Sequence, residues 1–231
     1  MRIMLAFLLS IACLSLMAGC PRRETAVSKE EFIYQFDGSL PIENITLTKV
    51  SAERRDPIYT PRLRSQDYFE LARRTFPADF VFDNQQLHSV GARSHRCDNP
   101  DHLDWMNFVW SVPDKQQAAR RLVIKVIVDA AAGYVSSQWT EMELTQGDPV
   151  VMSQNQAINS DRAESVLRAA YDAFVHTANT DALRSASDCT AHAHISERSV
   201  STWYVDFGSV SPTRVETYYV HNATLEVKRQ R

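Results

Sequence analysis

The sequence predicts an α+β fold in which helices pack on an antiparallel sheet. Several short segments are rich in β-branched and aromatic side chains, as strands are. Two other segments carry apolar residues at the spacing of one helix face. Turn and loop signals separate the strand candidates: glycine and proline over 38–41, a charged loop around 113–115 and a turn at 129–133.

The N-terminal part of the fold is expected to contain two strands and a short helix. Residues 32–36 and 45–50 have the composition of strands, and a turn with glycine and proline separates them. Ser65 is expected to cap a helix that ends near Phe76, because apolar residues follow at helical spacing and Pro77 marks a stop.

The middle of the chain predicts three strands. These are 105–112, 122–128 and 134–144, and a turn at 129–133 joins the last two. The second is the clearest strand, since its apolar residues alternate. The residues expected on one face are Leu122, Ile124, Val126 and Val128.

The clearest helix is predicted over residues 161–178. Asp161 and Glu164 form a pattern like a capping box at its start. Its polar face carries both acids and bases, so packing on a sheet is favoured over binding to a membrane surface. The apolar stripe consists of Ala163, Val166, Leu167, Ala170, Phe174 and Val175.

The C-terminal part predicts a hairpin of residues 203–210 and 215–220, then a short strand near 225–227. The two halves, 32–150 and 151–231, thus share an order of helix, cysteine, strand opening at tryptophan and second β-rich strand. This order suggests two helix-hairpin repeats from an internal duplication. Chance arrangement of common elements is the alternative, and the sequence leaves both open.

The N-terminal segment has the features of an export signal. Arg2 gives a positive start, residues 3–17 carry no charge, and the small residues Ala18 and Gly19 precede Cys20. This pattern resembles the type II signal peptide and lipobox of bacterial lipoproteins. A conventional secretory signal or a marginal anchor helix is the alternative.

The lipoprotein resemblance implies an address and a division of the chain. Residues 1–19 are removed as the signal peptide, and the thiol and new amine of Cys20 carry acyl chains such as palmitate, which anchor the protein in membrane lipid. Pro21 stands where aspartate marks inner-membrane retention, so the outer membrane is favoured. Residues 20–31 are then a linker, and residues 32–231 form a domain that faces the periplasm.

A second resemblance concerns the body of the chain. A helix precedes a hairpin whose end reads Val-Ile-Val-Asp-Ala-Ala-Ala-Gly-Tyr-Val over residues 126–135. This segment is similar to PepSY-type domains of bacterial envelope proteins, and the resemblance implies protein binding or modulation of a peptidase. The corresponding turn of the second half, at 221–224, lacks the glycine.

The cysteines allow three interpretations. Cys13 leaves with the signal and Cys20 is lipidated, so Cys97 and Cys189 remain in an oxidising compartment and are expected to form a disulfide. A metal site and two free thiols are the alternatives. The histidines that would join the cysteines in a metal site are His95, His102, His192 and His194.

Enzyme motifs and nucleic-acid signals are lacking in the sequence. It contains no phosphate-binding glycine loop, nucleophile elbow or zincin helix, and its formal net charge of −3 provides no basic patch for nucleic acid. The cluster of Asp98, Asp101, His102 and Asp104 lacks the glycine of an EF-hand loop, so a solvated turn is favoured over a cation site. No catalytic residue and no cofactor is therefore expected.

Aromatic residues in the strand candidates are expected mostly in the core. If one sheet face exposes several together, a binding surface for protein or glycan follows. The sequence thus predicts a membrane-anchored, non-catalytic module that binds or assembles an envelope protein partner. The alternatives are a PepSY-like modulator of a peptidase and a metal-binding or hydrolytic protein with an unrecognised site.

Overall fold

A computed structural model defines the fold. It describes residues 24–37, 40–51, 62–77, 80, 87–100, 102–113, 120–144, 158–177, 180–185, 187–196, 199–210 and 213–230. The expected signal peptide, residues 1–19, and Cys20 lie outside the described residues. No helix of the described residues is long and apolar enough to cross a membrane.

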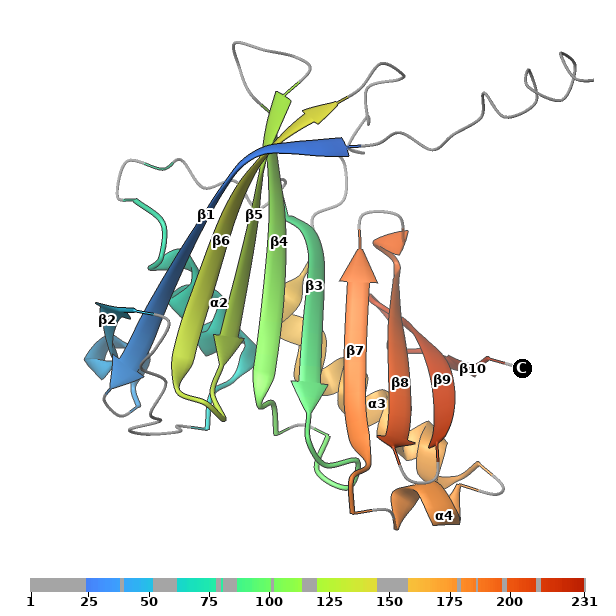
Figure 1. Cartoon of the computed structure of the whole chain (residues 1–231). Coiled ribbons are helices and arrows are strands. Elements are labelled where there is room, and N and C mark those ends of the chain that lie inside the picture. The colour runs from blue at the N-terminus through green and yellow to red at the C-terminus, as the bar shows by residue number, and fades with distance from the viewer. Residues whose placement is uncertain are drawn as a thin grey trace, which may run out of the picture.

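The described part of the chain is mostly β and forms one antiparallel sheet (Figure 1). The strand order across this ten-stranded sheet is β10-β9-β8-β7-β3-β4-β5-β6-β1-β2. The strands are β1 (Glu24–Asp37), β2 (Thr46–Val50), β3 (Leu87–Ser94), β4 (Trp105–Pro113), β5 (Arg120–Asp129), β6 (Tyr134–Leu144), β7 (Thr190–Ser196), β8 (Thr202–Val210), β9 (Thr213–His221) and β10 (Val227–Arg229).

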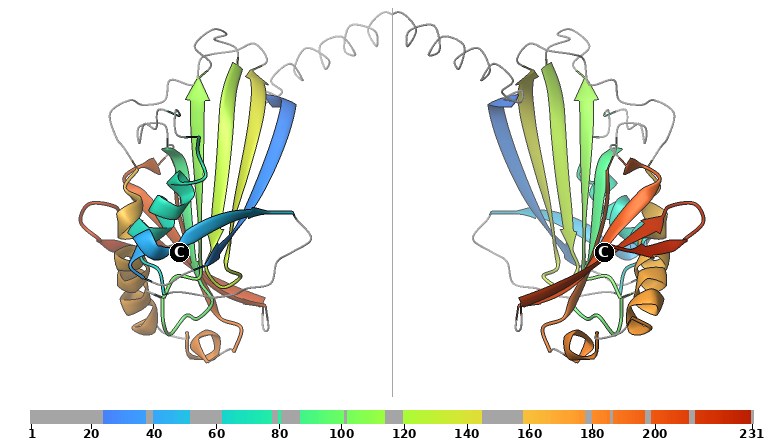
Figure 2. Two further views of the ribbon diagram at one scale, coloured as in Figure 1. Left: turned by 90° about the vertical axis from the view of Figure 1, so that its left-hand side faces the viewer. Right: turned by 90° about the vertical axis from the view of Figure 1, so that its right-hand side faces the viewer.

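Two main helices pack on the same face of this sheet, as the side views show (Figure 2). Helix α2 (Ser65–Arg73) lies over β4 to β6, and helix α3 (Ala163–Val175) lies over β7 to β9. The shorter elements are η1 (Ile42–Asn44), η3 (Ser160–Arg162) and α4 (Asp181–Arg184). Helices packed on an antiparallel sheet are thus confirmed, although strands take a larger share of the chain than the expected α+β class implies.

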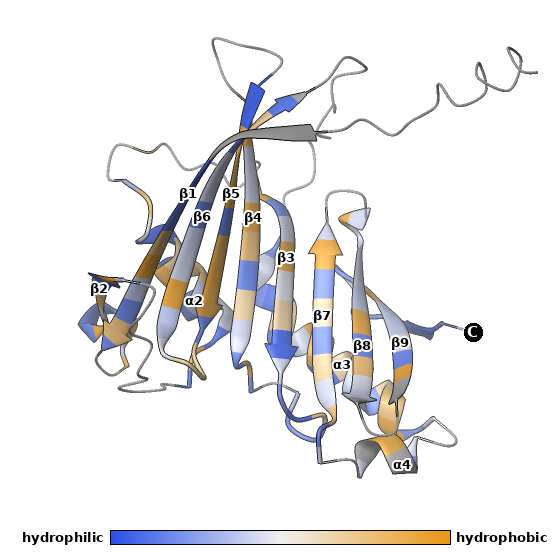
Figure 3. Ribbon diagram, in the orientation of Figure 1, coloured by the Kyte–Doolittle hydropathy of each residue, from blue (hydrophilic) through white to orange (hydrophobic). Residues whose placement is uncertain are grey.

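Alternation along the strands separates the core from the uncovered face (Figure 3). On β5, Ile124, Val126 and Val128 are fully buried towards the helices, whereas Lys125 between them is exposed. The expected shared face of this strand is therefore confirmed. The helices contribute Tyr68, Leu71, Ala72, Val166, Leu167, Ala170 and Phe174 to the same core.

Aromatic contacts and a hydrogen bond from Tyr68 help to attach the helices to the sheet. Phe174 of α3 stacks on Phe207 of β8 with ring centroids 4.4 Å apart. Tyr68 of α2 donates from its hydroxyl to the carbonyl oxygen of Leu103, at 2.7 Å, just before β4. Burial raises the pKa of Tyr68, so the phenol stays a neutral donor.

Strands β3 and β7 were not expected from the sequence. Strand β3 is rich in small residues, and β7 alternates alanine with histidine, so neither has the β-branched and aromatic content of its neighbours. The structure places them at the centre of the sheet, paired with each other from Ser89↔Ser196 to Ser94↔Ala191. Pairing on both sides compensates for their low intrinsic propensity.

The boundaries at two other elements also differ from the expectation. Strand β1 begins at Glu24, so residues 24–31 of the expected linker pair with β6 instead. Helix α2 is capped by Arg64, not Ser65: the backbone N–H of Arg64 donates to Asp67 at 2.8 Å. The helix ends at Arg73, and a turn carries the chain on to Phe76.

Candidate functional site

The face of the sheet opposite the helices is not covered by any described element, and Figure 1 looks onto it with α2 and α3 behind the strands. Alternation assigns residues to this open face, because their neighbours along each strand are buried against the helices. The open-face residues of the central strands are Gly91, Arg93, Trp105, Asn107, Val109, Val123, Lys125, His192, His194, Tyr204, Asp206, Thr217 and Tyr219.

Five rings follow one another across the open face, and we call them the aromatic row. Trp105 and His192 have ring centroids 6.1 Å apart, and His192 and His194 are 6.3 Å apart. His194 stacks on Tyr204 at 5.0 Å with an angle of 15° between the planes. Tyr204 meets Tyr219 edge to face at 5.2 Å. The row therefore crosses from β4 to β9.

The strand register explains why these rings meet. His194 pairs with Tyr204, and Tyr204 pairs with Tyr219, so the three side chains stand directly opposite one another. Gly91 on β3 pairs with both His194 and Asn107. A Cβ at Gly91 would lie 2.2 Å from Asn107 Oδ1, so glycine gives the Asn107 side chain room to lie over the sheet.

Arg93 lies between the two rings at one end of the row. It pairs with Trp105 on one side and with His192 on the other, and its guanidinium carbon is 5.5 Å from the Trp105 ring centroid. The Arg93 Nε and the Asn107 Oδ1 are both buried and have no hydrogen-bond partner among the described residues. An unsatisfied buried polar atom costs about 1–3 kcal/mol, so these two atoms are a local cost to the stability of the fold.

The electrostatics keep His192 neutral near pH 7. Burial lowers the pKa of His192, and the nearby His194 and Arg93 lower it further. Asp206, which pairs with His192 across β7 and β8, opposes this effect. The hydroxyl of Thr217 donates to Asp206 Oδ1 at 2.6 Å and so fixes this carboxylate.

A shallow groove of about 270 Å³ is lined by residues of β3 to β6, including Val109, Val123 and Lys125 of the open face. Val109, Val123 and Met142 give it apolar surface, while Arg121 and Lys125 add positive charge. The remaining lining residues are His88, Ser111, Gln138 and Thr140. Apolar surface beside cations suits a partner segment that carries both apolar and acidic groups.

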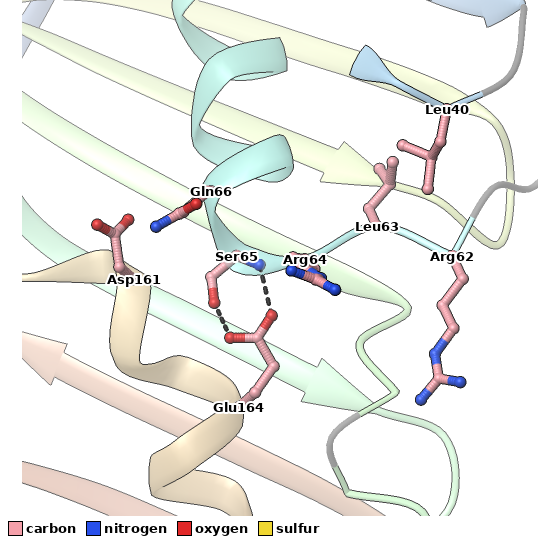
Figure 4. Close-up of a pocket in the computed structure, with 8 residues that line it drawn as sticks. All are labelled: Leu40, Arg62, Leu63, Arg64, Ser65, Gln66, Asp161 and Glu164. Carbon is pink, nitrogen blue, oxygen red and sulfur yellow. Dashed lines mark hydrogen bonds between the residues drawn. The ribbon is translucent and has the colours of Figure 1, made fainter.

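A second cavity, of about 680 Å³, lies where the two main helices begin (Figure 4). The carboxylate of Glu164, at the start of α3, accepts hydrogen bonds from the Ser65 hydroxyl and, at 2.5 Å, from the Ser65 backbone N–H. Burial raises the pKa of Glu164, and the hydrogen bond from Ser65 opposes that shift. The cavity is lined by Leu40, Arg62, Leu63, Arg64, Ser65, Gln66, Asp161 and Glu164.

This bond between Ser65 and Glu164 changes the expected capping pattern. Asp161 and Glu164 do not form a capping box. The Glu164 carboxylate instead accepts from Ser65 of α2, and the side chain of Asn159 accepts from the Asp161 N–H at 3.0 Å. Glu164 thus serves the N-terminus of the other helix, where a carboxylate is favoured by the exposed N–H groups and the helix dipole. Its visible role is to join the two halves.

The expected disulfide is present between Cys97 and Cys189, with their Cα atoms 5.4 Å apart. It lies at the end of the β3–β7 pair, where the Cys97 N–H also donates to the Cys189 carbonyl at 3.1 Å. Both thiols are consumed, so the mixed thiolate and imidazole metal site is excluded. The described residues hold no group of three or more His, Cys, Asp or Glu side chains that could bind a metal ion.

The acidic cluster after β3 is divided among local contacts. Asp98 forms a two-point ion pair with Arg96, whose Nη2 is 2.6 Å away, and Asp104 accepts from the His95 backbone N–H at 2.5 Å. His102 lies in the same turn region, and Asp101 lies outside the described residues. These contacts agree with the solvated turn favoured by the sequence.

Sequence reasoning missed how Gly91, Arg93, His192 and His194 are brought together. A signal was present in Ala191-His192-Ala193-His194-Ile195, whose period of two is that of a half-buried strand. Because Cys189 lies close by, the same histidines were also candidates for a mixed cysteine and histidine metal site. Arg93 carried no signal, since its neighbours come from strands far away in sequence.

Comparisons with known proteins do not assign a family. No family model matches the chain, and no curated protein matches it. A solved structure with a weak match is HtdX of Mycobacterium tuberculosis, at 8% identity and a TM-score of 0.17, over 66% of this chain and 82% of that one. Similarity at this level carries no argument about fold or function.

Proposed function

We propose that the protein is a lipid-anchored component of the bacterial envelope that binds a protein partner through the open face of its sheet. The anchor is the acylated Cys20, and the favoured address is the periplasmic side of the outer membrane. The single observation that carries the binding role is the aromatic row on the open face. The proposed role is non-catalytic.

The composition of the open face supports this proposal. Aromatic side chains and arginine are enriched at protein interfaces, and here Trp105, Tyr204, Tyr219 and Arg93 gather on one uncovered surface. By contrast, the large rings of Phe108, Trp110 and Trp203 are buried in the core. The disulfide suits an oxidising compartment such as the periplasm.

We also infer that the two halves arose by duplication. Helix α2 is followed by four consecutive strands, β3 to β6, and α3 and α4 are followed by four more, β7 to β10. The first strand of each set pairs antiparallel with the first strand of the other. Each helix also lies over strands of its own set. This arrangement supports a repeat of a helix with four strands, a larger unit than a helix with one hairpin.

A PepSY-like role in modulating a peptidase is a second candidate. Its support is local: Gly133 closes the β5–β6 hairpin with a positive φ of 69°, a backbone conformation that glycine adopts without strain. The resemblance rests on this hairpin, and it too implies a protein partner. A purified peptidase whose rate changes on addition of this protein would distinguish the modulator from an assembly component.

The test is site-specific photocrosslinking in cells that make the full-length protein. A photoreactive residue replaces Lys125 on the open face, and a matched control replaces Asp172, which is exposed on α3. We expect a discrete crosslinked partner at position 125 that is absent at position 172. Cys20→Ala, combined with the Lys125 probe, should weaken this crosslink by releasing the protein from the membrane. Equal crosslinking at both positions, or none at 125, contradicts the proposed surface.

A further inference from the structure

We propose that His192 and His194 form a binding site for a divalent transition-metal ion, with Cu²⁺ as the preferred ion. Both histidines lie on β7, two residues apart, so their side chains project from the same face of the strand. This site differs from the mixed cysteine and histidine site considered from the sequence, because the disulfide removes both thiols. It is also independent of whether the open face binds a protein.

The separation of the rings permits chelation. The two imidazole centroids are 6.3 Å apart. An ion bound at about 2.0–2.1 Å from one nitrogen of each ring requires the two nitrogens to lie within about 4 Å of each other. Rings at the observed separation meet this requirement when each turns one nitrogen towards the other. His194 is exposed and can make this adjustment.

Neighbouring side chains limit the positions that the two rings adopt. His194 is stacked on Tyr204 at 5.0 Å, and His192 is flanked by Trp105 at 6.1 Å. The two imidazoles therefore lie side by side with 27° between their planes, and binding of an ion turns them out of this arrangement and breaks the stack of His194 on Tyr204.

A carboxylate is the register neighbour of His192 on the next strand. A metal-ligating imidazole usually has a carboxylate or carbonyl near its other nitrogen, which fixes the ring and increases its basicity. Here Asp206 lies opposite His192 in the register, and Thr217 donates to this carboxylate at 2.6 Å. The order Thr217, Asp206, His192 crosses three adjacent strands.

The donor set selects the kind of ion. Two neutral imidazole ligands suit copper, nickel and zinc rather than calcium or magnesium, and among divalent ions Cu²⁺ binds most tightly to a given nitrogen site. Since the described residues offer no third protein ligand of the usual types, water fills the remaining positions. The site is thus open and exchangeable, unlike a closed structural metal centre.

The experiment is a Cu²⁺ titration of the detergent-solubilised, full-length protein, purified without a histidine tag and stripped with chelator. Affinity is measured by competition with a chelator of known strength, and electron paramagnetic resonance reports the number of nitrogen ligands. We expect one Cu²⁺ per chain with two nitrogen ligands and a weaker, competing site for Zn²⁺. His192→Gln and His194→Gln should each lower the affinity for Cu²⁺ at least tenfold.

Two further variants separate this site from general surface binding. His176→Gln, at the exposed end of α3, is the matched control and should leave both affinity and spectrum unchanged. Asp206→Asn should lower affinity about 10-fold to 100-fold through the orientation of His192. Thermal unfolding of the metal-free variants confirms that each is folded. The proposal is overturned if no saturable site appears, or if His194→Gln keeps a two-nitrogen spectrum at the original affinity.

Discussion

The disulfide provides the strongest quantitative prediction, for the double variant Cys97→Ala/Cys189→Ala. The bridge joins residues separated by 92 positions in the sequence. In the chain-entropy model, closing a loop of this size lowers the stability of the unfolded state by about 4.5 kcal/mol. The native β3–β7 pair keeps its backbone hydrogen bonds without the bridge. Removing the bridge should therefore act mainly by giving the unfolded chain more conformational freedom.

Urea denaturation followed by tryptophan fluorescence measures this effect. The four tryptophans report on the whole sheet because they lie on β4, β6 and β8. With a slope of about 2 kcal/mol per molar urea, a loss of about 4.5 kcal/mol lowers the midpoint by roughly 2 M. The wild-type protein in reductant should unfold at the midpoint of the double variant, whereas Lys228→Ala, on an exposed ion pair, should shift it little.

The reasoning is refuted if the urea midpoint of the double variant falls by well under about 0.5 M, which is roughly a quarter of the expected change. It would mean that the bridge does not constrain the unfolded chain as the model assumes, or that the thiols are not joined in the protein as isolated. Mass spectrometry with and without reductant decides between these two explanations.

The remaining predictions concern the core, the junction of the two helices and the open face. Phe174→Ala should destabilise the fold by about 3–5 kcal/mol, because it leaves a cavity against the stacked Phe207; urea denaturation measures the loss, and a value below about 1 kcal/mol would contradict the packing. Glu164→Ala should cost about 1–3 kcal/mol, since it leaves the buried Ser65 groups without their partner, whereas Glu164→Gln keeps an acceptor and should be milder near pH 7. Because the pKa of Glu164 is raised in the folded state, its protonation stabilises the fold at low pH, and this contribution is lost as the pH rises through the folded pKa. The urea midpoint of the wild type should therefore fall, relative to that of Glu164→Gln, as the pH is raised across about pH 4–8. The lowered pKa of His192 has the opposite effect. It stabilises the fold above the ordinary histidine pKa of about 6.5, and this contribution is lost as the pH falls through the folded pKa. An NMR titration of His192 with a midpoint above about 6.5 would show that burial does not determine its pKa.

Local periodicity predicted most of the elements. Strands β4, β5, β6, β8 and β9 lie close to the expected ranges, because their β-branched and aromatic residues alternate. The core face of α3 was also recognisable: Ala163, Val166, Leu167, Ala170 and Phe174 are all buried. Each of these patterns is contained within one element and needs no knowledge of its neighbours.

Pairing at the centre of the sheet was not predictable in this way. Strands β3 and β7 have little intrinsic β-propensity, and their stability comes from being paired on both sides. The hydrogen bond between Ser65 and Glu164 was not predictable either, because the two residues are 99 positions apart. A local capping rule assigns Glu164 to the start of its own helix. In both cases, the interaction that forms depends on a partner far away in the sequence.

The sequence by itself predicted the cysteine pair and most strands, and the structure confirms both. The export signal and the lipid anchor remain predictions. Only the tertiary structure decided that His192 and His194 stand beside Arg93, Trp105 and Tyr204 on an uncovered face. The physical reason is that alternation tells which residues share a face, whereas the neighbours across a sheet depend on strand order and register, which contacts between distant segments establish.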